Sequence, residues 1–469
     1  MVKTNSKITE GPIFKSLFFF TVPIMLTGLL QVMYNMADNI VVGKFSGDPL
    51  ALAAVGSTTA LTALFTNSLL NVATGGGVII AQSYGARDYA RTSRGIQTAM
   101  TFSLIAGISL GAIAFALSSP MLELLGTKSE IFSRALLYFR IICIGIPAIT
   151  VYNFGAAILR STGNSKTPLY ILSASGIVNV LLNLFFVIVC GMSVDGVAIA
   201  TIISQYLSAI AVLFVLCRSK EESTRFDIKK FFIDGKLLSR MLSIGIPAAL
   251  QSMMFSISNM ILTSATNTLS AVEVSAKTIA FNVDALLYTV LNSFSSGTMT
   301  FVGQNYGARS YDRIKKSILC AMVQIVAVGV LLGQSMILFS KEIVGLYLDP
   351  LDPSAPAVLE YAIELSIFIL SCYFLCGIME SLTAAARALG HSVAPMIISI
   401  IGTCVFRAVW AIFIFPIPKF NSLVGLFICY PISWILVIVS LIVVLLIVMK
   451  KTKKLMSSDE KKPETAQIS

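Results

Sequence analysis

Few side chains in this sequence could carry out chemistry, and the strongest candidates lie inside long apolar segments. Asp38 follows an uncharged run over residues 16–37, and Asp284, Glu380 and Arg407 also stand within apolar stretches. An ionisable group in such a setting is costly to bury and is kept mainly where it binds an ion or a substrate. These four residues are therefore the first candidates for a functional site.

Polar side chains near Asp38 in the sequence, or on one face of another segment, could complete such a site. Tyr34 and Asn35 precede Asp38 by about one helical turn. Asn179 and Asn183 are four residues apart, so they share one face of a helix. Tyr34 and Asn35 could satisfy or sense the carboxylate, and we take Asn179 and Asn183 as further candidates for a cation-coupling site. Amides with this spacing also form ordinary hydrogen bonds between membrane helices, which is the structural alternative.

Flexible apolar side chains on two of the segments could line a substrate cleft. They are Met33, Met36, Met253, Met254 and Phe255. Methionine is unbranched and polarisable, so it suits a surface that accepts ligands of different shapes. Ordinary packing between helices is the alternative for each of them.

The sequence offers little that resembles an enzyme active site or a structural metal centre. The eight cysteines form no Cys-x-x-Cys pair, and His391 is the only histidine. A His-Glu-x-x-His motif is therefore absent as well. We expect no catalytic residue, no cofactor, and no metal other than a possible Na⁺ at Asp38.

The composition is that of a membrane protein. Of 469 residues, 56% are hydrophobic and 12% are charged, whereas about 25% are charged in a typical soluble domain. About 20 apolar residues suffice to cross the hydrocarbon core of a bilayer, and such runs recur along nearly the whole chain. We predict an all-α polytopic membrane protein with twelve transmembrane helices. They are expected at residues 14–43, 54–82, 95–118, 134–159, 167–190, 196–217, 238–265, 276–304, 317–340, 358–386, 394–416 and 422–449.

The charged loops predict the orientation of the chain. The formal net charge is +11, and basic residues gather in alternate loops, above all in residues 218–240, and beside the last apolar segment. Cytoplasmic loops carry an excess of Lys and Arg, so we place both termini in the cytoplasm and the protein in the plasma membrane. Residues 451–469 are expected to form a disordered cytoplasmic tail.

A short motif recurs at about half the length of the chain. Residues 82–87 read Gln-Ser-Tyr-Gly-Ala-Arg, and residues 304–309 read Gln-Asn-Tyr-Gly-Ala-Arg. Each copy stands where an apolar segment ends. We expect Gly85 and Gly307 to end their helices in a left-handed conformation.

The repeat extends to other positions and defines two lobes. Pro23 matches Pro247 at an offset of 224, close to the offset of 222 between the motifs. Since six helices are an even number, both copies enter the membrane from the same side, and the repeats are parallel. We predict an N-lobe over residues 1–217, a cytoplasmic linker over 218–240 and a C-lobe over 241–450, with a central cleft between the six-helix lobes.

Several of these segments together resemble the MATE family, the multidrug and toxic compound extrusion transporters of the MOP flippase superfamily. The resemblance rests on MADNIVVGKFSGDPLALAAVG at residues 36–56, on the pair AQSYGAR and GQNYGAR, and on AAILRSTGNSKTP and TAAARALGHSVAP. It covers nearly the whole chain. It implies a prokaryotic antiporter of twelve helices in two lobes that exports organic cations or other amphiphiles in exchange for H⁺ or Na⁺.

The resemblance also implies roles for residues of the first lobe. Asp38 stands where family members carry a carboxylate that couples cation binding to transport, and Asn179 matches a family asparagine beside it. Asn183 stands where many relatives have aspartate, so a site with two acids is not carried over. Pro23 lies in the helix that bends in some relatives, which makes it a candidate hinge. A static kink is the alternative.

In the second lobe the resemblance is weaker at the functional positions. Some relatives bind Na⁺ through a glutamate of the seventh helix, where this sequence has Phe255, with Gln251 one turn earlier. A sodium site of that kind is therefore not expected. Glu380 and Arg407 could form a buried ion pair between the tenth and eleventh helices, or could, like Asp284, take part in transport.

We therefore predict a secondary active exporter in which a cation binds at Asp38 and the lobes rock to release substrate outward. It is expected to act as a monomer on small organic cations, with no nucleic-acid partner and no enzymatic activity. The alternative is a flippase for a lipid-linked substrate, from the same superfamily. Such a flippase would need several basic residues in its cleft, and only Arg140 and Arg407 are embedded here.

Overall fold

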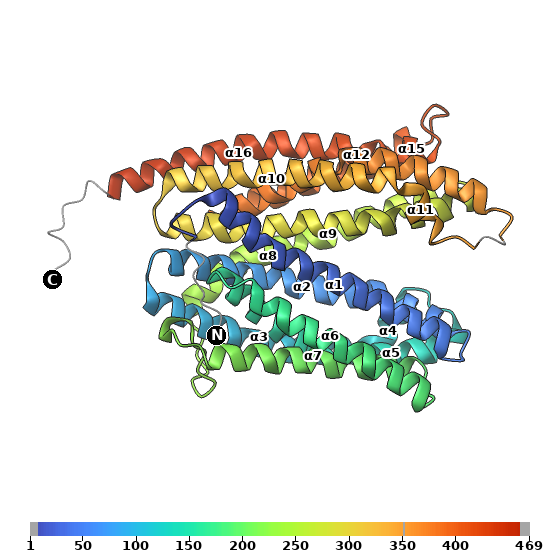
Figure 1. Cartoon of the computed structure of the whole chain (residues 1–469), viewed down its shortest axis with the longest axis horizontal. Helices are drawn as coiled ribbons and strands as arrows, with labels where there is room; N and C mark the ends of the chain where they lie inside the picture. Colours follow the sequence, from blue (N-terminus) through green and yellow to red (C-terminus); the bar gives the residue numbers. More distant parts are fainter. Residues whose placement is uncertain (1–7, 350–351, 460–469) are drawn as a thin grey trace. The chain divides into compact units, whose positions relative to one another are not determined.

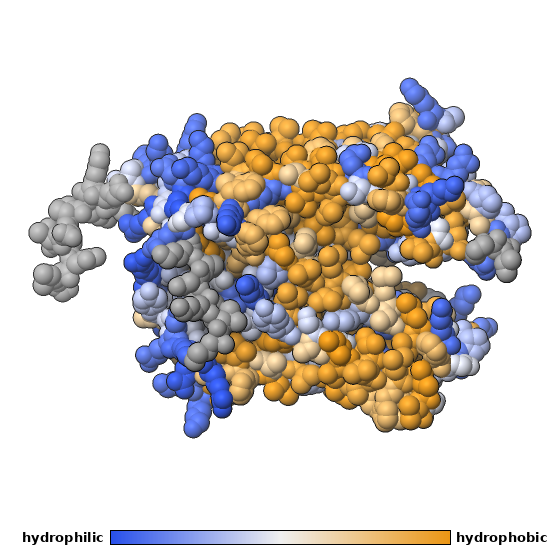
Figure 2. Space-filling view, viewed as in Figure 1, coloured by the Kyte–Doolittle hydropathy of each residue, from blue (hydrophilic) through white to orange (hydrophobic). Residues whose placement is uncertain are grey.

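The computed structural model of the chain describes residues 8–349 and 352–459 (Figure 1). Within these residues the regular structure is entirely helical, and twelve helices are long and apolar enough to cross a membrane. Figure 2 shows apolar side chains along the middle of the helices and hydrophilic side chains toward their ends, as a bilayer requires. The predicted all-α fold with twelve membrane helices is confirmed.

The helices form two compact units, and unit 1 contains Leu26–Ala249. Its helices come from the first half of the chain, apart from the start of α8. In order, unit 1 holds the end of α1 (Ile13–Phe45), α2 (Ala51–Gly85), α3 (Tyr89–Ala116), α4 (Ser118–Leu124), α5 (Ser129–Ser161), α6 (Lys166–Leu184), the π-helix η1 (Phe185–Val189), α7 (Val194–Cys217), the 3₁₀ turn η2 (Glu222–Thr224) and the start of α8 (Gly235–Thr266).

Unit 2 contains residues 8–25 and the described residues from Leu250 onward. Its eleventh spanning segment, expected as one helix, alternates between α-helical and π-helical turns. In order, unit 2 holds the start of α1, the end of α8, α9 (Ala271–Gly307), α10 (Tyr311–Leu338), α11 (Ser340–Gly345), α12 (Ala355–Ala388), α13 (Val393–Ser399), η3 (Ile400–Val405), α14 (Phe406–Val409), η4 (Trp410–Ile414), α15 (Leu423–Phe427) and α16 (Cys429–Asp459).

Two helices divide their length between the units. Residues of α1 up to Met25 belong to unit 2 and those from Leu26 to unit 1, while α8 belongs to unit 1 up to Ala249 and to unit 2 from Leu250. Each division follows a proline inside the helix by two residues, Pro23 in α1 and Pro247 in α8. Proline removes one intrahelical hydrogen bond, so each helix is locally weakened beside the point where its packing partners change.

Within unit 1, α2 and the start of α8 approach backbone to backbone. A Cβ atom on Gly75 would lie 2.8 Å from the backbone nitrogen of Gly245, and a Cβ on Gly245 would lie 2.8 Å from the Cα of Val72. Unit 2 repeats this crossing between α9 and the start of α1, where a Cβ on Gly297 would meet the Thr21 hydroxyl at 2.5 Å. The duplication therefore preserves the helix crossing as well as the motif.

The ends of α2 and α9 differ from the prediction. Gly85 and Gly307 are the last helical residues, and the left-handed residues are Arg87, with φ of 58°, and Arg309, with φ of 56°. The amide of Asp88 donates to the carbonyl of Ser83 at 3.1 Å, which closes a Schellman turn around Arg87. The expectation for the two glycines was wrong because each helix ends two residues before its left-handed residue.

The C-terminal segment also differs from the prediction. Helix α16 continues to Asp459, so residues 451–459 of the expected disordered tail are helical. Lysine is a good helix former, and the run Lys450–Lys454 extends the last membrane helix beyond its apolar part. The rest of the predicted tail, residues 460–469, lies outside the described residues.

At one end of unit 1, hydrogen bonds of Asp48 stabilise the loop between α1 and α2. Asp48 accepts hydrogen bonds from the Arg134 guanidinium on α5, the Leu50 amide at 3.0 Å and the Ser193 hydroxyl at 3.5 Å. Burial opposes ionisation of Asp48, but these hydrogen bonds and the positive charge of Arg134 outweigh it. They hold the pKa of this carboxyl below its ordinary value.

Candidate functional site

The strongest candidate of the sequence lies in a polar cluster inside unit 1. Asp38 is partly buried on α1 and faces side chains of two other helices. Asn183 of α6 donates from Nδ2 to Asp38 Oδ1 at 2.5 Å, and Thr201 of α7 donates from Oγ1 to Asp38 Oδ2 at 3.5 Å. The same Asn183 nitrogen lies 3.4 Å from Asn179 Oδ1. Three helices thus meet through one carboxylate.

The two asparagines are almost completely enclosed. Asn183 is 0% exposed and Asn179 is 5% exposed. The amide of Asn183 donates to Asp38, whereas its buried Oδ1 has no hydrogen-bond partner among the described residues. A buried acceptor without a partner is costly, and a proton donor or a cation beside it would remove that cost.

Tyr34 and Asn35 do not bind Asp38 as predicted. The Tyr34 hydroxyl donates to the backbone carbonyl of Ser173 on α6 at 3.3 Å, and a Cβ atom on Gly176 would collide with the Tyr34 ring. Tyr34 therefore holds α1 against α6 one turn from the carboxylate. Asn35 is exposed, and no hydrogen bond joins it to Asp38.

Sequence reasoning missed Thr201, which is the second donor to the carboxylate. Its single hydroxyl proton is shared between this carboxylate and the Val197 carbonyl at 2.9 Å, which is the usual local bond of a threonine inside a helix. Threonine is common in membrane helices for that reason, so Thr201 carries no recognisable signal. Only the packing of α7 against α6 brings it to Asp38.

The arrangement can hold one monovalent positive charge. The hydrogen-bond donors to Asp38 come from neutral side chains, so the carboxylate is the one formal charge in this cluster. No group of three His, Cys, Asp or Glu side chains within the described residues could hold a metal ion. A single carboxylate with amide and hydroxyl neighbours offers oxygen atoms that suit a proton or Na⁺ better than a transition metal.

The backbone beside this cluster departs from regular helix geometry. Helix α6 gives way to the π-helix η1 at Phe185, two residues after Asn183. Single π-helical turns interrupt α-helices frequently at functional sites. The position of η1 is therefore consistent with a working role for the asparagine.

In unit 2, Arg407 is a fixed buried cation. It is 5% exposed and lies on α14 between the π-helical segments η3 and η4. Its Nε donates to the Ser433 hydroxyl at 3.1 Å, and its Cζ lies 3.6 Å from the centre of the Tyr430 ring. The hypothesis of a Glu380–Arg407 ion pair is wrong for the described residues, because Arg407 turns toward α16.

The other candidates of unit 2 have different neighbours. Arg387 donates from Nη2 to Gln251 Oε1 at 2.6 Å and is the charge that acts most directly on Glu380. Asp284 on α9 is buried, and the positive charge of Lys277 on the same helix acts on it. Gln251 is thus occupied by an arginine. Transport roles for Asp284 and Glu380 stay predictions.

The side chains expected in a substrate cleft differ in exposure. Met33 and Met36 of α1 are exposed, whereas Met253, Met254 and Phe255 of α8 are half-buried. Phe255 packs against the apolar core of unit 2. Their role in substrate binding stays a prediction.

Comparison with known proteins assigns the chain to a family. The MatE family model matches residues 23–185 and, a second time, residues 247–413, which confirms the internal duplication. A probable multidrug resistance protein YoeA of Bacillus subtilis is 27% identical over 92% of this chain and 93% of its own length. A FAD transporter of Shewanella oneidensis is 24% identical over 93% of this chain and 95% of its own length.

A solved structure shows the same fold. The crystal structure of a MATE protein in the bent conformation superposes with a TM-score of 0.86 and covers 97% of this chain and 100% of that chain, at 22% sequence identity. The two matches of the family model start at Pro23 and Pro247, the prolines beside which α1 and α8 pass between the units. This chain belongs to the MATE family of multi-pass membrane transporters.

Proposed function

We propose that this protein is a secondary active multidrug exporter in which Asp38 couples transport to the movement of H⁺ or Na⁺. The observation that carries the proposal is the bonding of Asp38 to α6 and α7 through Asn183 and Thr201. A relative named as a probable multidrug resistance protein supports small-molecule drugs as the substrates, and we propose that these are organic cations and other amphiphiles.

The coupling step uses the hydrogen bonds of the carboxylate. When Asp38 is ionised, it attracts the Asn183 amide, and it can accept a proton or a cation in place of that donor. Asn183 now turns its nitrogen toward Asp38, and rotation of its amide would bring the unpartnered Oδ1 to an incoming Na⁺ as a second oxygen ligand. Occupation of the site therefore changes how α1 is held against α6 and α7.

Movement of α1 then links the site to the rest of the chain. Tyr34 holds α1 to α6 through Ser173, and Pro23 weakens the helix beside its division between the units. A change in the hydrogen bonds of Asp38 therefore changes the bend of α1 at Pro23. We propose that this bending drives the alternation between inward-facing and outward-facing states.

The cellular setting follows from the charge pattern. We propose that both termini lie in the cytoplasm and the protein in the plasma membrane, because cytoplasmic loops carry an excess of Lys and Arg. We propose that the chain acts as a monomer, because each polypeptide contains both repeats, and that it uses no cofactor besides the coupling ion.

Transport by reconstituted protein tests the proposal. The full chain is placed in liposomes, and export of a fluorescent organic cation such as ethidium is followed under an imposed pH gradient and, separately, an imposed Na⁺ gradient. Asp38→Asn is expected to abolish gradient-driven export while leaving the fold intact. Asp195→Asn is the matched control, because it makes the same chemical change at the first turn of α7, outside the Asp38 cluster.

The two gradients separate the coupling ions. Export under only one of them identifies the ion, and export by wild type with loss in Asp38→Asn supports the carboxylate. Wild-type rates in the Asp38→Asn variant would remove Asp38 from the mechanism. No flux of any organic cation under either gradient would contradict the exporter assignment.

A further inference from the structure

A basic pocket lies at one end of unit 1, away from Asp38. It has a volume of about 600 Å³ and is formed by the start of α3 and the start of α8. Its charged lining consists of Arg91, Arg94, Lys236, Arg240 and Asp234. Four cationic side chains against one carboxylate leave a formal charge of +3 in the pocket.

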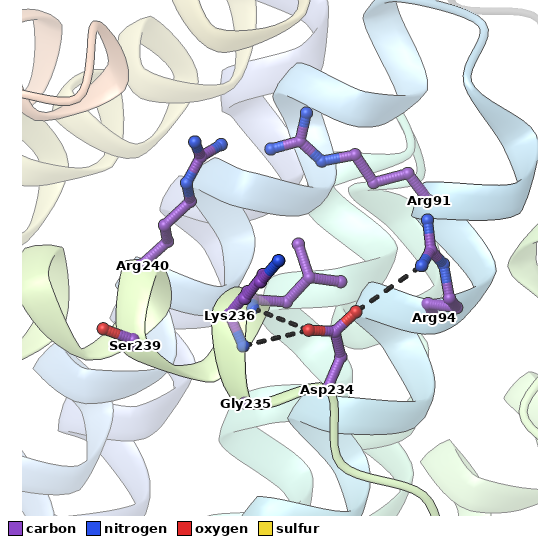
Figure 3. Close-up of a pocket in the computed structure, with 8 residues that line it drawn as sticks. Arg91, Arg94, Asp234, Gly235, Lys236, Ser239 and Arg240 are labelled. Carbon is purple, nitrogen blue, oxygen red and sulfur yellow. Dashed lines mark hydrogen bonds and ion pairs between the residues drawn. The ribbon is translucent and has the colours of Figure 1, made fainter.

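Only one of the four cations is paired within the pocket. Arg94 lies 3.6 Å from Asp234 Oδ2, and Asp234 Oδ1 accepts the amides of Lys236 and Leu237 at 3.0 and 3.1 Å. The carboxylate is therefore committed to Arg94 and to capping α8. Figure 3 shows these bonds on one side of the pocket.

The remaining cations face a common space. In Figure 3 the guanidinium groups of Arg91, from α3, and Arg240, from α8, extend toward each other above the Lys236 ammonium. Within residues 8–349 and 352–459 these three side chains make no hydrogen bond or ion pair. Like charges gathered around an open space repel one another, so an anion bound there would lower the energy of the site.

The second repeat shows how the equivalent arginine is satisfied when protein fills the place. Arg313 is the counterpart of Arg91 at the motif offset of 222. Its guanidinium donates to the carbonyls of Ile8 at 2.9 Å and Gly11 at 3.1 Å, and to Asn305 Oδ1 at 3.0 Å. Unit 2 thus supplies three protein acceptors for this arginine.

Unit 1 lacks the side-chain acceptor, and the Arg91 side chain makes no hydrogen bond to a carbonyl within the described residues. The counterpart of Asn305 is Ser83, whose hydroxyl donates to the Ile79 carbonyl of its own helix. Arg91 therefore keeps its guanidinium available, although the helix that carries it is built like α10. After the duplication, Arg313 is hydrogen-bonded by protein acceptors, whereas its counterpart Arg91 is available to bind a ligand.

The linker segment that leads into the pocket exposes two aromatic side chains directly after Lys229 and Lys230. Phe231 is 65% exposed and Phe232 is 47% exposed, while Phe226 is buried and fixes the linker to the end of α7 through its amide and the Leu216 carbonyl at 3.1 Å. Exposed aromatic side chains beside cations at the end of membrane helices are suited to the boundary between head groups and acyl chains.

We propose that this pocket binds the phosphate group of an anionic phospholipid. Arg91 and Arg240 hold the phosphate oxygens as bidentate donors, Lys236 adds a point charge, and Phe231 and Phe232 lie in the acyl region beside the head group. Its volume falls within the range of about 300–1,000 Å³ that is usual for ligand sites. The aromatic neighbours favour a lipid over free phosphate, which shares the same chemistry.

Native mass spectrometry of the full chain in detergent tests the proposal. The probes are dioctanoyl phosphatidylglycerol, dioctanoyl phosphatidylcholine with the same chains, and inorganic phosphate. The Arg91→Gln/Arg240→Gln variant removes two charges from the pocket. The matched control Lys315→Gln/Lys316→Gln removes two charges from exposed positions at the corresponding end of α10 in unit 2. The thermal midpoint of each variant shows whether it is folded.

Wild type is expected to retain phosphatidylglycerol at lower concentrations than phosphatidylcholine. The pocket variant is expected to bind phosphatidylglycerol about 10- to 30-fold more weakly, from the usual contribution of two basic side chains at a membrane surface. The control variant is expected to bind like wild type. Equal retention by the pocket and control variants would overturn the site. Binding of inorganic phosphate as tightly as phosphatidylglycerol would overturn its assignment to a lipid.

Discussion

The close approach of α2 to the start of α8 gives a quantitative prediction about unit 1. Replacing Gly75 by alanine places a methyl group against the backbone of Gly245 and the carbonyl of Met241. Glycine to alanine inside a helix gains about 0.5–1 kcal/mol from helix propensity. Overpacking costs about 1–3 kcal/mol, and the upper part of that range applies here because backbone atoms cannot rotate away.

Gly75→Ala is therefore expected to destabilise unit 1 by about 1–2 kcal/mol. For a unit of this size that corresponds to a fall of about 2–8 °C in the thermal midpoint. Gly56 lies in the same helix, and a Cβ there would meet nothing within 4 Å. Gly56→Ala is thus the control, and it is expected to raise the midpoint by about 1–4 °C from propensity alone.

The second repeat supplies an intermediate case. A methyl group on Gly297 would press on the Thr21 hydroxyl and, at 3.3 Å, on a methyl of Leu17, which are side-chain atoms that can shift. Gly297→Ala is therefore expected to cost less than Gly75→Ala. The predicted order of midpoints, from highest to lowest, is Gly56→Ala, wild type, Gly297→Ala and Gly75→Ala.

Two optical signals measure this order in detergent at one scan rate. Circular dichroism at 222 nm follows the helices of both units. Tryptophan fluorescence follows unit 2, because Trp410 and Trp434 are the two tryptophans of the chain. Gly75→Ala should lower the dichroism midpoint more than the fluorescence midpoint, and Gly297→Ala should affect fluorescence at least as much. Equal midpoints for Gly75→Ala and Gly56→Ala would refute the backbone contact.

Two further predictions concern charged groups. Because the pKa of Asp48 is held low, its stabilisation of unit 1 is present above its unfolded value of about 3.9 and is lost as the pH falls through its folded value. Thermal midpoints measured from pH 7 to pH 3 should fall less for Asp48→Asn than for wild type. At pH 7 the two proteins should differ in free energy of unfolding by at most roughly 1 kcal/mol, because Arg134 is partly exposed. Parallel curves of midpoint against pH would contradict the pairing. Arg407→Met should lower the fluorescence midpoint of unit 2 by losing a desolvated cation–π contact of about 2 kcal/mol. The exposed Arg140 of unit 1, which lies over Phe115 at 5.4 Å, is the matched control as Arg140→Met. The two variants are compared by the dichroism midpoint, which follows both units, and an equal effect on that midpoint would refute the buried role.

The fold was predictable because its signals are local. Runs of apolar residues specify membrane helices wherever they occur, and the repeated motif marks the same helix ends in both halves. The pairing of Asp38 with Asn183 was also within reach, since an isolated carboxylate in lipid needs a donor and Asn183 shares a helix face with Asn179.

Other features depended on packing between distant segments. The division of α1 and α8 between the units leaves no trace in composition, because both parts of each helix are equally apolar. The sequence around Thr201 does not distinguish it from other threonines of membrane helices, because only the packing of α7 against α6 brings it to Asp38. Arg407 was paired with Glu380 because opposite charges were the only partners that sequence reasoning could offer. In the structure the Arg407 guanidinium lies over the ring of Tyr430 instead. A sequence does not distinguish an aromatic residue that binds a cation from one that only packs in the core.

The two repeats differ at the positions that form the Asp38 cluster in unit 1. Besides Pro23 and Pro247 at an offset of 224, Arg160 matches Arg387 at 227 and Gly196 matches Gly425 at 229. At these three offsets the counterparts of Asp38, Asn183 and Thr201 are Leu262, Trp410 and Tyr430, which all belong to the apolar core of unit 2. The leucine at that position packs in the apolar core, whereas a carboxylate there would need donors that these residues do not supply. Tyr430 instead receives the fixed cation Arg407. Unit 1 has a carboxylate with neutral hydrogen-bond donors at this place, and unit 2 has aromatic rings beside a permanent positive charge. Under our proposal that Asp38 couples transport, an ion that binds and leaves acts through the first site, because the equivalent place in unit 2 already holds a fixed cation.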